Sequence, residues 1–226
     1  MEKSLIVKNI EMSDFNLIRH ELNKLTEMPP WGRAQGDQWD RLSNFIYRLQ
    51  TLQGVRRQAQ AVAKAAGLST KEFEAYSVRR WYNHHTHDQI LQMFEAHAEV
   101  QPEDNRKHRT VDFYLRGLPF DLKVSRFPQA YPKSLKYAWQ HRHHLALWQY
   151  EHQSKQGRYH TGNRLFIILH HRLQPELSWQ LRRDFEALEI LIQDFLDAPI
   201  LLGLTLTDHH TQEVYRPWSG IIFHVK

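Results

Sequence analysis

Residues 110–125 constrain the fold more than any other stretch of this sequence, because apolar and polar side chains alternate there on both sides of Arg116-Gly117. Alternation with a period of two is typical of a half-buried strand, and a turn centred on Arg116-Gly117 predicts a β-hairpin. One face of the hairpin would be apolar and enter the core, while the other would carry Asp112, Asp121 and Lys123. The register predicts four facing pairs: Leu115–Leu118, Tyr114–Pro119, Phe113–Phe120 and Asp112–Asp121.

The pair Asp112 and Asp121 is the unusual feature of the polar face. Facing side chains have Cβ atoms roughly 5 Å apart, so two carboxylates would repel by about 3 kcal/mol at an effective dielectric constant of about 20. A shared proton or a bound divalent cation would relieve that repulsion. Lys123 follows on the same face, where it could orient or deprotonate a water molecule or stabilise an oxyanion. The alternative is an ordinary solvated hairpin face, although Asp is depleted in strands.

The rest of the chain predicts helices first and a mixed sheet afterwards. Helical spacing of apolar residues precedes the hairpin over residues 14–27, 37–53, 56–66, 69–81 and 87–97. Gly67 should end the third of these helices, and Ser69 with Glu72 forms a capping box that opens the fourth. After the hairpin we expect helices over 134–153 and 176–196, and strands over 165–169, 202–207 and 221–225. The expected fold class is therefore α/β, with an N-terminal helical region over residues 1–82 and an α/β core over 83–226.

Composition narrows the class of protein. The chain has 226 residues and no cysteine, which excludes disulfide scaffolds and thiolate zinc sites. It contains no long apolar stretch and no secretory signal pattern, so we expect a cytoplasmic protein without a membrane partner. The sequence pI of about 9.4 points to a polyanionic partner.

The run Asp112…Asp121-Leu122-Lys123 resembles the signature of the PD-(D/E)xK nuclease superfamily. The helix and the apolar strand downstream fit the order of that fold, and the likeness covers roughly residues 80–226, outside the N-terminal helices. Val111 replaces the proline of the signature. Residues 110–123 and 153–166 also resemble an uncharacterised bacterial branch of the superfamily.

The resemblance implies a restriction-endonuclease-like mixed β-sheet flanked by helices, and a role for each signature residue. Asp112 and Asp121 would hold Mg²⁺, with Mn²⁺ as a substitute, and Lys123 would serve the attacking water. The family often adds an acid from the preceding helix, and Glu95 is the candidate chosen here, ahead of Glu99 and Asp88. Each of these acids could instead be a solvated helix residue.

The segment after the hairpin is basic and rich in aromatic residues, whereas residues 176–197 are acidic. Arginine and lysine contact phosphates, and aromatic rings can stack on bases. The alternative is a solvated basic helix with Trp139 and Trp148 in the core. The candidate nucleic-acid-binding residues are Arg126, Lys136, Arg142, Lys155, Arg158, His160 and Asn163.

We therefore expect a Mg²⁺-dependent nuclease, an endonuclease acting on double-stranded DNA in restriction or defence. Cleavage of both strands would fit a homodimer. The alternative is a non-catalytic nucleic-acid-binding or assembly protein that retains the nuclease fold. A third class, a His-rich metal-binding protein, is suggested by His84-His85-Thr86-His87, but adjacent histidines point in different directions and do not easily chelate one ion.

Overall fold

The computed structural model describes residues 16–30, 36–105, 108, 110–152, 161–208 and 211–226. The chain divides into two compact units, Met1–Gln89 and Ile90–Lys226, which we call the N-terminal and the C-terminal unit and describe separately. The division falls inside helix α4 (Thr70–Glu95), seven residues after the boundary expected at residue 82.

The N-terminal unit is helical, but the single helix predicted over 37–53 is wrong. The structure has α2 (Gln38–Leu42), a 3-10 turn η1 (Asn44–Tyr47), and then α3 (Leu52–Ala65). Polar side chains cap the starts of α2 and α3. Asp37 accepts a hydrogen bond from the Trp39 N–H and starts α2, and Thr51 accepts one from the Gly54 N–H and starts α3.

The signals at the end of α3 are confirmed. Gly67 has a φ of +64°, the left-handed conformation of a residue that follows a helix, and the Leu68 N–H bonds to the Ala63 carbonyl. The Ser69 hydroxyl accepts from the Glu72 N–H at the start of α4. However, α4 runs unbroken through both helices predicted over 69–81 and 87–97.

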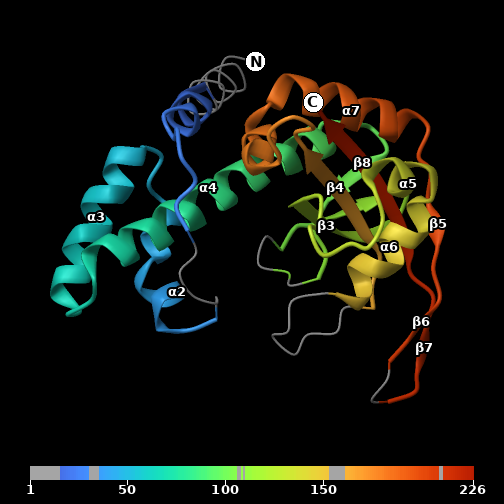
Figure 1. Ribbon diagram of the computed structural model, residues 1–226, viewed down its shortest axis with the longest axis horizontal. Coiled ribbons are helices and arrows are strands. Elements are labelled where there is room, and N and C mark those ends of the chain that lie inside the picture. Colours follow the sequence, from blue (N-terminus) through green and yellow to red (C-terminus); the bar gives the residue numbers. More distant parts are fainter. Residues whose placement is uncertain (1–15, 31–35, 106–107, 109, 153–160, 209–210) are drawn as a thin grey trace. The chain divides into compact units, whose positions relative to one another are not determined.

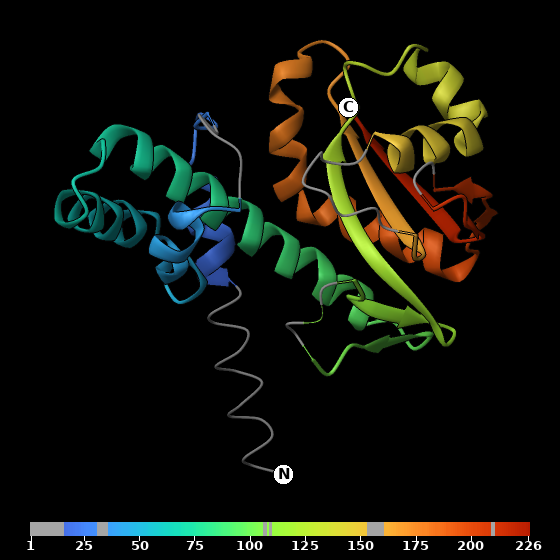
Figure 2. The same cartoon turned by 90° about the horizontal axis from the view of Figure 1, so that it is seen from below.

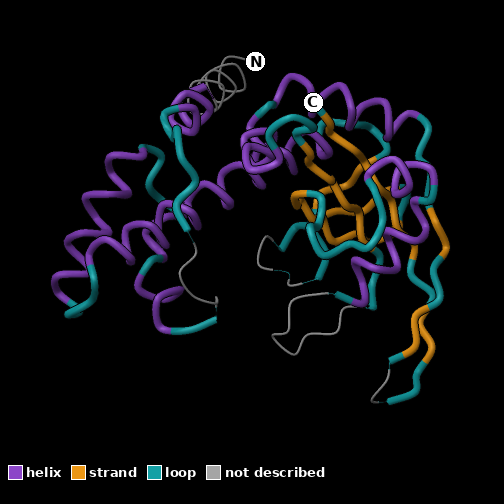
Figure 3. Tube along the Cα trace, viewed as in Figure 1, coloured by secondary structure: helices purple, strands orange, loops and turns teal. Residues whose placement is uncertain are grey.

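The C-terminal unit contains a mixed sheet that, among the described residues, has the strand order β1-β2-β3-β4-β8-β5 (Figures 1 and 3). Neighbours β3, β4 and β8 are parallel, and the outer strands pair antiparallel. A separate hairpin joins β6 and β7. The bounds are β1 (Val100–Pro102), β2 (Phe113–Leu115), β3 (Leu118–Arg126), β4 (Arg164–His170), β5 (Leu202–Gly203), β6 (Leu206–Thr207), β7 (Val214–Tyr215) and β8 (Trp218–Val225).

Both faces of this sheet are covered, so β4 is buried on each side. Leu165, Ile167 and Leu169 pack with the end of α4, the 3-10 helix η2 (Pro175–Arg183) and α7 (Phe185–Asp197). Phe166 and Ile168 pack on the other face with α5 (Leu135–Gln140) and α6 (Arg142–Glu151). The α/β class with a mixed, helix-flanked sheet is therefore confirmed.

Two predicted helices of this unit differ from the structure. The helix over 134–153 is divided at His141 into α5 and α6, and the helix over 176–196 becomes η2 followed by α7. Asp184 marks the second break, where its carboxylate binds His224 and Lys226 at the end of β8. The short strands β1 and β7 were not predicted, and the strand expected over 202–207 consists of β5 and β6.

Candidate active site

The predicted hairpin is present with its predicted register. Phe113 pairs with Phe120, Tyr114 with Pro119 and Leu115 with Leu118. Arg116 and Gly117 form the turn with φ angles of +51° and +79°, as a two-residue type I′ turn requires.

The regular pairing ends just before the expected fourth pair. The Asp112 N–H bonds to the Phe120 carbonyl at 2.8 Å, so the backbone at Asp112 shifts from the position opposite Asp121. The Asp112 carboxylate instead accepts the Leu122 N–H, with 2.7 Å between Oδ2 and N. Asp112, the residue just before β2, thus directs its carboxylate to the backbone of β3.

Asp121 lies in the interior of β3 and is only 5% exposed. Its Oδ1 is 2.6 Å from the Nζ of Lys123, and its Oδ2 is 2.9 Å from the Nε of Arg164. Burial of a carboxylate is costly unless it is paired, and these two cations supply that pairing for Asp121 inside the unit. The structure therefore brings Asp121 and Lys123 together as the pattern predicts, and adds Arg164.

Arg164 was not among the predicted site residues. It opens β4 directly beside Asp121 in the parallel β3–β4 register, and it is as buried as its partner. Its guanidinium lies 5.6 Å from the ring centre of Tyr150 on α6, whose hydroxyl donates to the Gly162 carbonyl at 2.8 Å. Burial raises the pKa of Tyr150 and keeps that phenol neutral. The one sequence signal that could have indicated its role is its position directly before the apolar run 165–169.

A pocket of about 380 Å³ opens beside Asp121 and Arg164. Thr110, Val111 and Pro119 line it from the hairpin, and Thr161, Gly162 and Asn163 line it from the segment before β4. Asn163 fixes the rim: its Nδ2 donates to the Pro119 carbonyl and its Oδ1 accepts the Trp218 N–H. Asn163 was predicted to bind nucleic acid, and here its amide connects β3 to β8.

The two aspartates offer hard oxygen ligands of the kind that Mg²⁺ prefers. Mg²⁺ is commonly held by one or two carboxylates together with water and substrate oxygens. Each carboxylate oxygen has two lone pairs, so a carboxylate that accepts a hydrogen bond can also ligate a cation. The type of donor therefore suits a magnesium ion, whose remaining ligands would be water and substrate oxygens.

Glu95 does not join the two aspartates in a three-residue metal group, because the described residues contain no such group of His, Cys, Asp or Glu. Glu99 pairs with Arg116 beside the turn, with 2.7 Å between Oε2 and Nε. Asp88 belongs to the N-terminal unit.

The predicted nucleic-acid-binding residues are found in different settings. Arg126 ends β3 and Lys136 lies on α5, and both are exposed. Arg142 is half-buried: its guanidinium lies 5.9 Å from the ring of Trp139 and 5.7 Å from that of Phe223, and burial lowers its pKa. Lys155, Arg158 and His160 lie outside the described residues.

The histidine run has structural contacts in the N-terminal unit. The Nε2 of His85 lies 3.2 Å from the carbonyl oxygens of Ile46 and Leu49, and the His84 ring packs edge-on against Tyr47. Burial lowers the pKa of each histidine to about 4, so both rings are neutral at pH 7.

Compared with protein-family models, curated proteins and solved structures, the chain matches none. In the part of the chain that the structure describes, no helix is long and apolar enough to cross a bilayer.

Proposed function

We propose that this protein is a Mg²⁺-dependent nuclease that hydrolyses phosphodiester bonds in double-stranded DNA, with a restriction-endonuclease-like core. One observation carries the proposal: three residues of the signature meet at β3. The exposed ammonium of Lys123 lies 2.6 Å from the buried carboxylate of Asp121, and the carboxylate of Asp112 accepts the Leu122 N–H of the same strand. The resemblance to the PD-(D/E)xK signature assigns these same residues to catalysis.

The chemistry would be divided among the residues of the hairpin. Asp112 and Asp121 would hold the ion, which when bound polarises the scissile phosphate and lowers the pKa of a coordinated water. Lys123 has a side chain that is 46% exposed, so its ammonium can turn from Asp121 toward the attacking water or a phosphate oxygen. Arg164 remains on the other oxygen of Asp121 and keeps that carboxylate in place while Lys123 moves.

The proposed DNA contacts come from the exposed cations beyond the hairpin. Arg126 and Lys136 are available for phosphates, whereas Arg142 stacks within its own unit. Cleavage of both strands would be served by a homodimer, in which each copy presents one site.

The test is cleavage of supercoiled and linear double-stranded DNA with Mg²⁺ or Mn²⁺. Asp112→Asn is the sharpest variant, because asparagine still accepts the Leu122 N–H while the charge is lost. Lys123→Met removes an exposed ammonium. We expect both variants to lose cleavage by a hundredfold or more, as is usual when a general acid–base or electrostatic group is removed. Asp194→Asn, an exposed carboxylate on α7, is the matched control and should cleave like the wild type.

The same experiment tests the alternative, a nucleic-acid-binding protein without turnover. That alternative is favoured by the neutral charge balance at the site, where Asp112 and Asp121 lie with two cations, Lys123 and Arg164. Salt-dependent DNA binding by the wild type, with no product in either metal, would replace the nuclease proposal by this one. Full activity in Asp112→Asn and Lys123→Met would show that any cleavage arises elsewhere.

A further inference from the structure

A second pocket lies at the opposite end of the β3–β4 pair from Asp121. The strands are parallel neighbours, but their connections separate: the chain leaves β3 toward α5 and α6 on one face, and leaves β4 toward η2 and α7 on the other. Figure 2 shows the two connections parting at the end of the sheet near the C-terminus. In open α/β sheets, such a point at the carboxyl ends of the strands forms a crevice in which ligands bind.

The crevice contains a pocket of about 480 Å³, within the range of small-molecule sites. Arg126, Phe127, Tyr131 and Lys133 line it from the β3 connection, and His170 and Ser178 line it from the β4 connection. Arg126 lies five positions after Asp121 along the extended strand β3, a distance of roughly 17 Å, so this pocket is distinct from the candidate active site.

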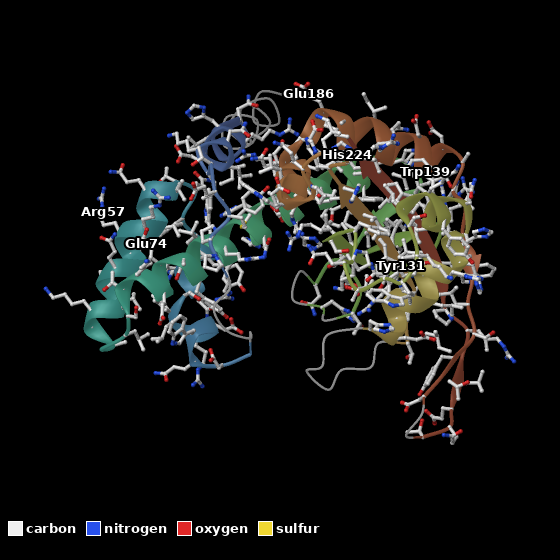
Figure 4. All side chains as sticks on the ribbon, viewed as in Figure 1. Arg57, Glu74, Tyr131, Trp139, Glu186 and His224 are labelled. Carbon is white, nitrogen blue, oxygen red and sulfur yellow. The ribbon has the colours of Figure 1, made fainter. Side chains whose placement is uncertain are left out.

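The wall of this pocket includes a buried polar group without a partner in the described part of the chain, the Tyr131 hydroxyl. Its side chain lines the pocket and is only 8% exposed, yet its hydroxyl has no hydrogen-bond partner among the described residues (the residue is labelled in Figure 4). Leaving a buried hydroxyl unsatisfied is costly, and a native structure rarely does so without a reason. The hydroxyl oxygen itself is closed to solvent, so a ligand acceptor in the pocket would satisfy it once the Tyr131 side chain turns toward the pocket.

The lining indicates the chemistry of that ligand. Arg126 and Lys133 supply two exposed cations, and no carboxylate is among the described residues that line the pocket. The ring of Phe127 packs edge-on against Tyr131 at 5.8 Å and against His170 at 5.7 Å, which makes one wall aromatic. Burial, with Arg172 and His171 nearby, lowers the pKa of His170, so its ring is a neutral part of that wall at pH 7.

We propose that this pocket binds a nucleoside monophosphate. The phosphate would lie against Arg126 and Lys133, and the heterocyclic ring would lie along the aromatic wall. The Tyr131 hydroxyl would donate to an acceptor of the ligand. This site shares Arg126 with the proposed DNA contacts but lies away from Asp121 and Lys123, and it needs neither a metal nor cleavage.

The test is isothermal titration calorimetry of the full chain in EDTA, with AMP, CMP, GMP and UMP as probes. Inorganic phosphate and the matching nucleosides separate the two halves of the ligand. We expect at least one monophosphate to bind with a stoichiometry of one, and phosphate alone and the nucleosides to bind at least tenfold more weakly.

Two variants test the residues, and each has a matched control. Tyr131→Phe should weaken binding about five- to tenfold, the usual effect of one hydrogen bond, while leaving the thermal stability of the ligand-free protein equal or higher, because it deletes an unsatisfied hydroxyl. Lys133→Gln should weaken binding by a similar factor. Tyr215→Phe on β7 and Lys64→Gln on α3 should leave the affinity unchanged.

Three results would overturn the proposal. The first is no saturable binding of any monophosphate at millimolar concentration. The second is an affinity that Tyr131→Phe and Lys133→Gln both leave intact. The third is phosphate binding as tightly as the monophosphates, which would mean an adventitious ion only. Because the titration contains no metal, none of these results bears on the nuclease proposal.

Discussion

Replacing Arg164 with Met should destabilise the C-terminal unit by about 3 kcal/mol. The change removes the guanidinium from the Oδ2 of Asp121, 2.9 Å away, and leaves a carboxylate that is 5% exposed with one cation instead of two. Breaking a buried ion pair from one side typically costs about 3–5 kcal/mol. We take the lower end because Lys123 still contacts Oδ1 and methionine fills much of the vacated volume. The lost contact with the Tyr150 ring adds to the same loss.

The measurement should follow hydrogen exchange of β3 and β4 amides in increasing denaturant, because the two units need not unfold together. Arg126→Met, an exposed arginine at the end of β3, is the matched control and should change stability by less than about 0.5 kcal/mol. The double variant Asp121→Asn with Arg164→Met should lose at least about 1.5 kcal/mol less than the sum of the single variants. A loss below about 1 kcal/mol in Arg164→Met, or additive single effects, would refute the reasoning.

Two further predictions concern pH and packing. Because burial lowers the pKa of His84 and of His85 from 6.5 to about 4, the unfolded chain binds more protons between these values, so the stability of the N-terminal unit should be complete above pH 6.5 and fall toward pH 4. Each pKa shift is worth about 3 kcal/mol before allowance for partial exposure, so we expect the free energy of unfolding to fall by about 2 kcal/mol in total. The variant His85→Gln should show roughly half of this loss, and an unchanged pH slope in that variant would contradict the assignment. Gly220→Ala would place a Cβ 2.8 Å from Phe195 Cζ and should cost about 2 kcal/mol in chemical denaturation, whereas Gly162→Ala meets nothing within 4 Å and should be tolerated; equal stabilities would show that the core yields at Phe195.

The central strands of the sheet were predictable from the sequence because their signals are local, whereas the short edge strand β1 was not. Alternation and a Gly117 turn that accepts a positive φ fixed the β2–β3 register, and the five apolar residues of 165–169 indicated a strand covered on both faces. The register of a strand decides which of its side chains enter the core, so a strand with one apolar face specifies its register strongly.

The helix boundaries were less predictable because tertiary contacts decide them. The α2–η1–α3 region has a continuous apolar pattern, but Thr51 accepts a backbone N–H and starts a new helix within it. Conversely, α4 continues past Thr86, whose hydroxyl bonds to the Tyr82 carbonyl within the helix. Local side-chain bonds of this kind compete with or support a helix in ways that periodicity does not reveal.

Arg164 could not be predicted as part of the site because its role depends on a pairing 43 residues apart in sequence. The hairpin pattern showed two acids and a lysine, which suggested that the acids would share a proton or bind a divalent cation. Only the parallel alignment of β3 with β4 places a second cation on the buried carboxylate.

That second cation separates stability from chemistry within the candidate site. Arg164 is buried with Asp121, so the fold depends on this pair, as buried pairs require. Lys123 is 46% exposed, and an ion pair at that exposure contributes only about 0–1 kcal/mol. A lysine that contributes so little to stability, yet contacts a buried strand carboxylate beside a pocket, is free to exchange Asp121 for a substrate phosphate or a water molecule. The proposed division therefore assigns the holding of Asp121 to Arg164 and the reaction to Lys123, so Lys123→Met should abolish cleavage in a protein that remains nearly as stable as the wild type.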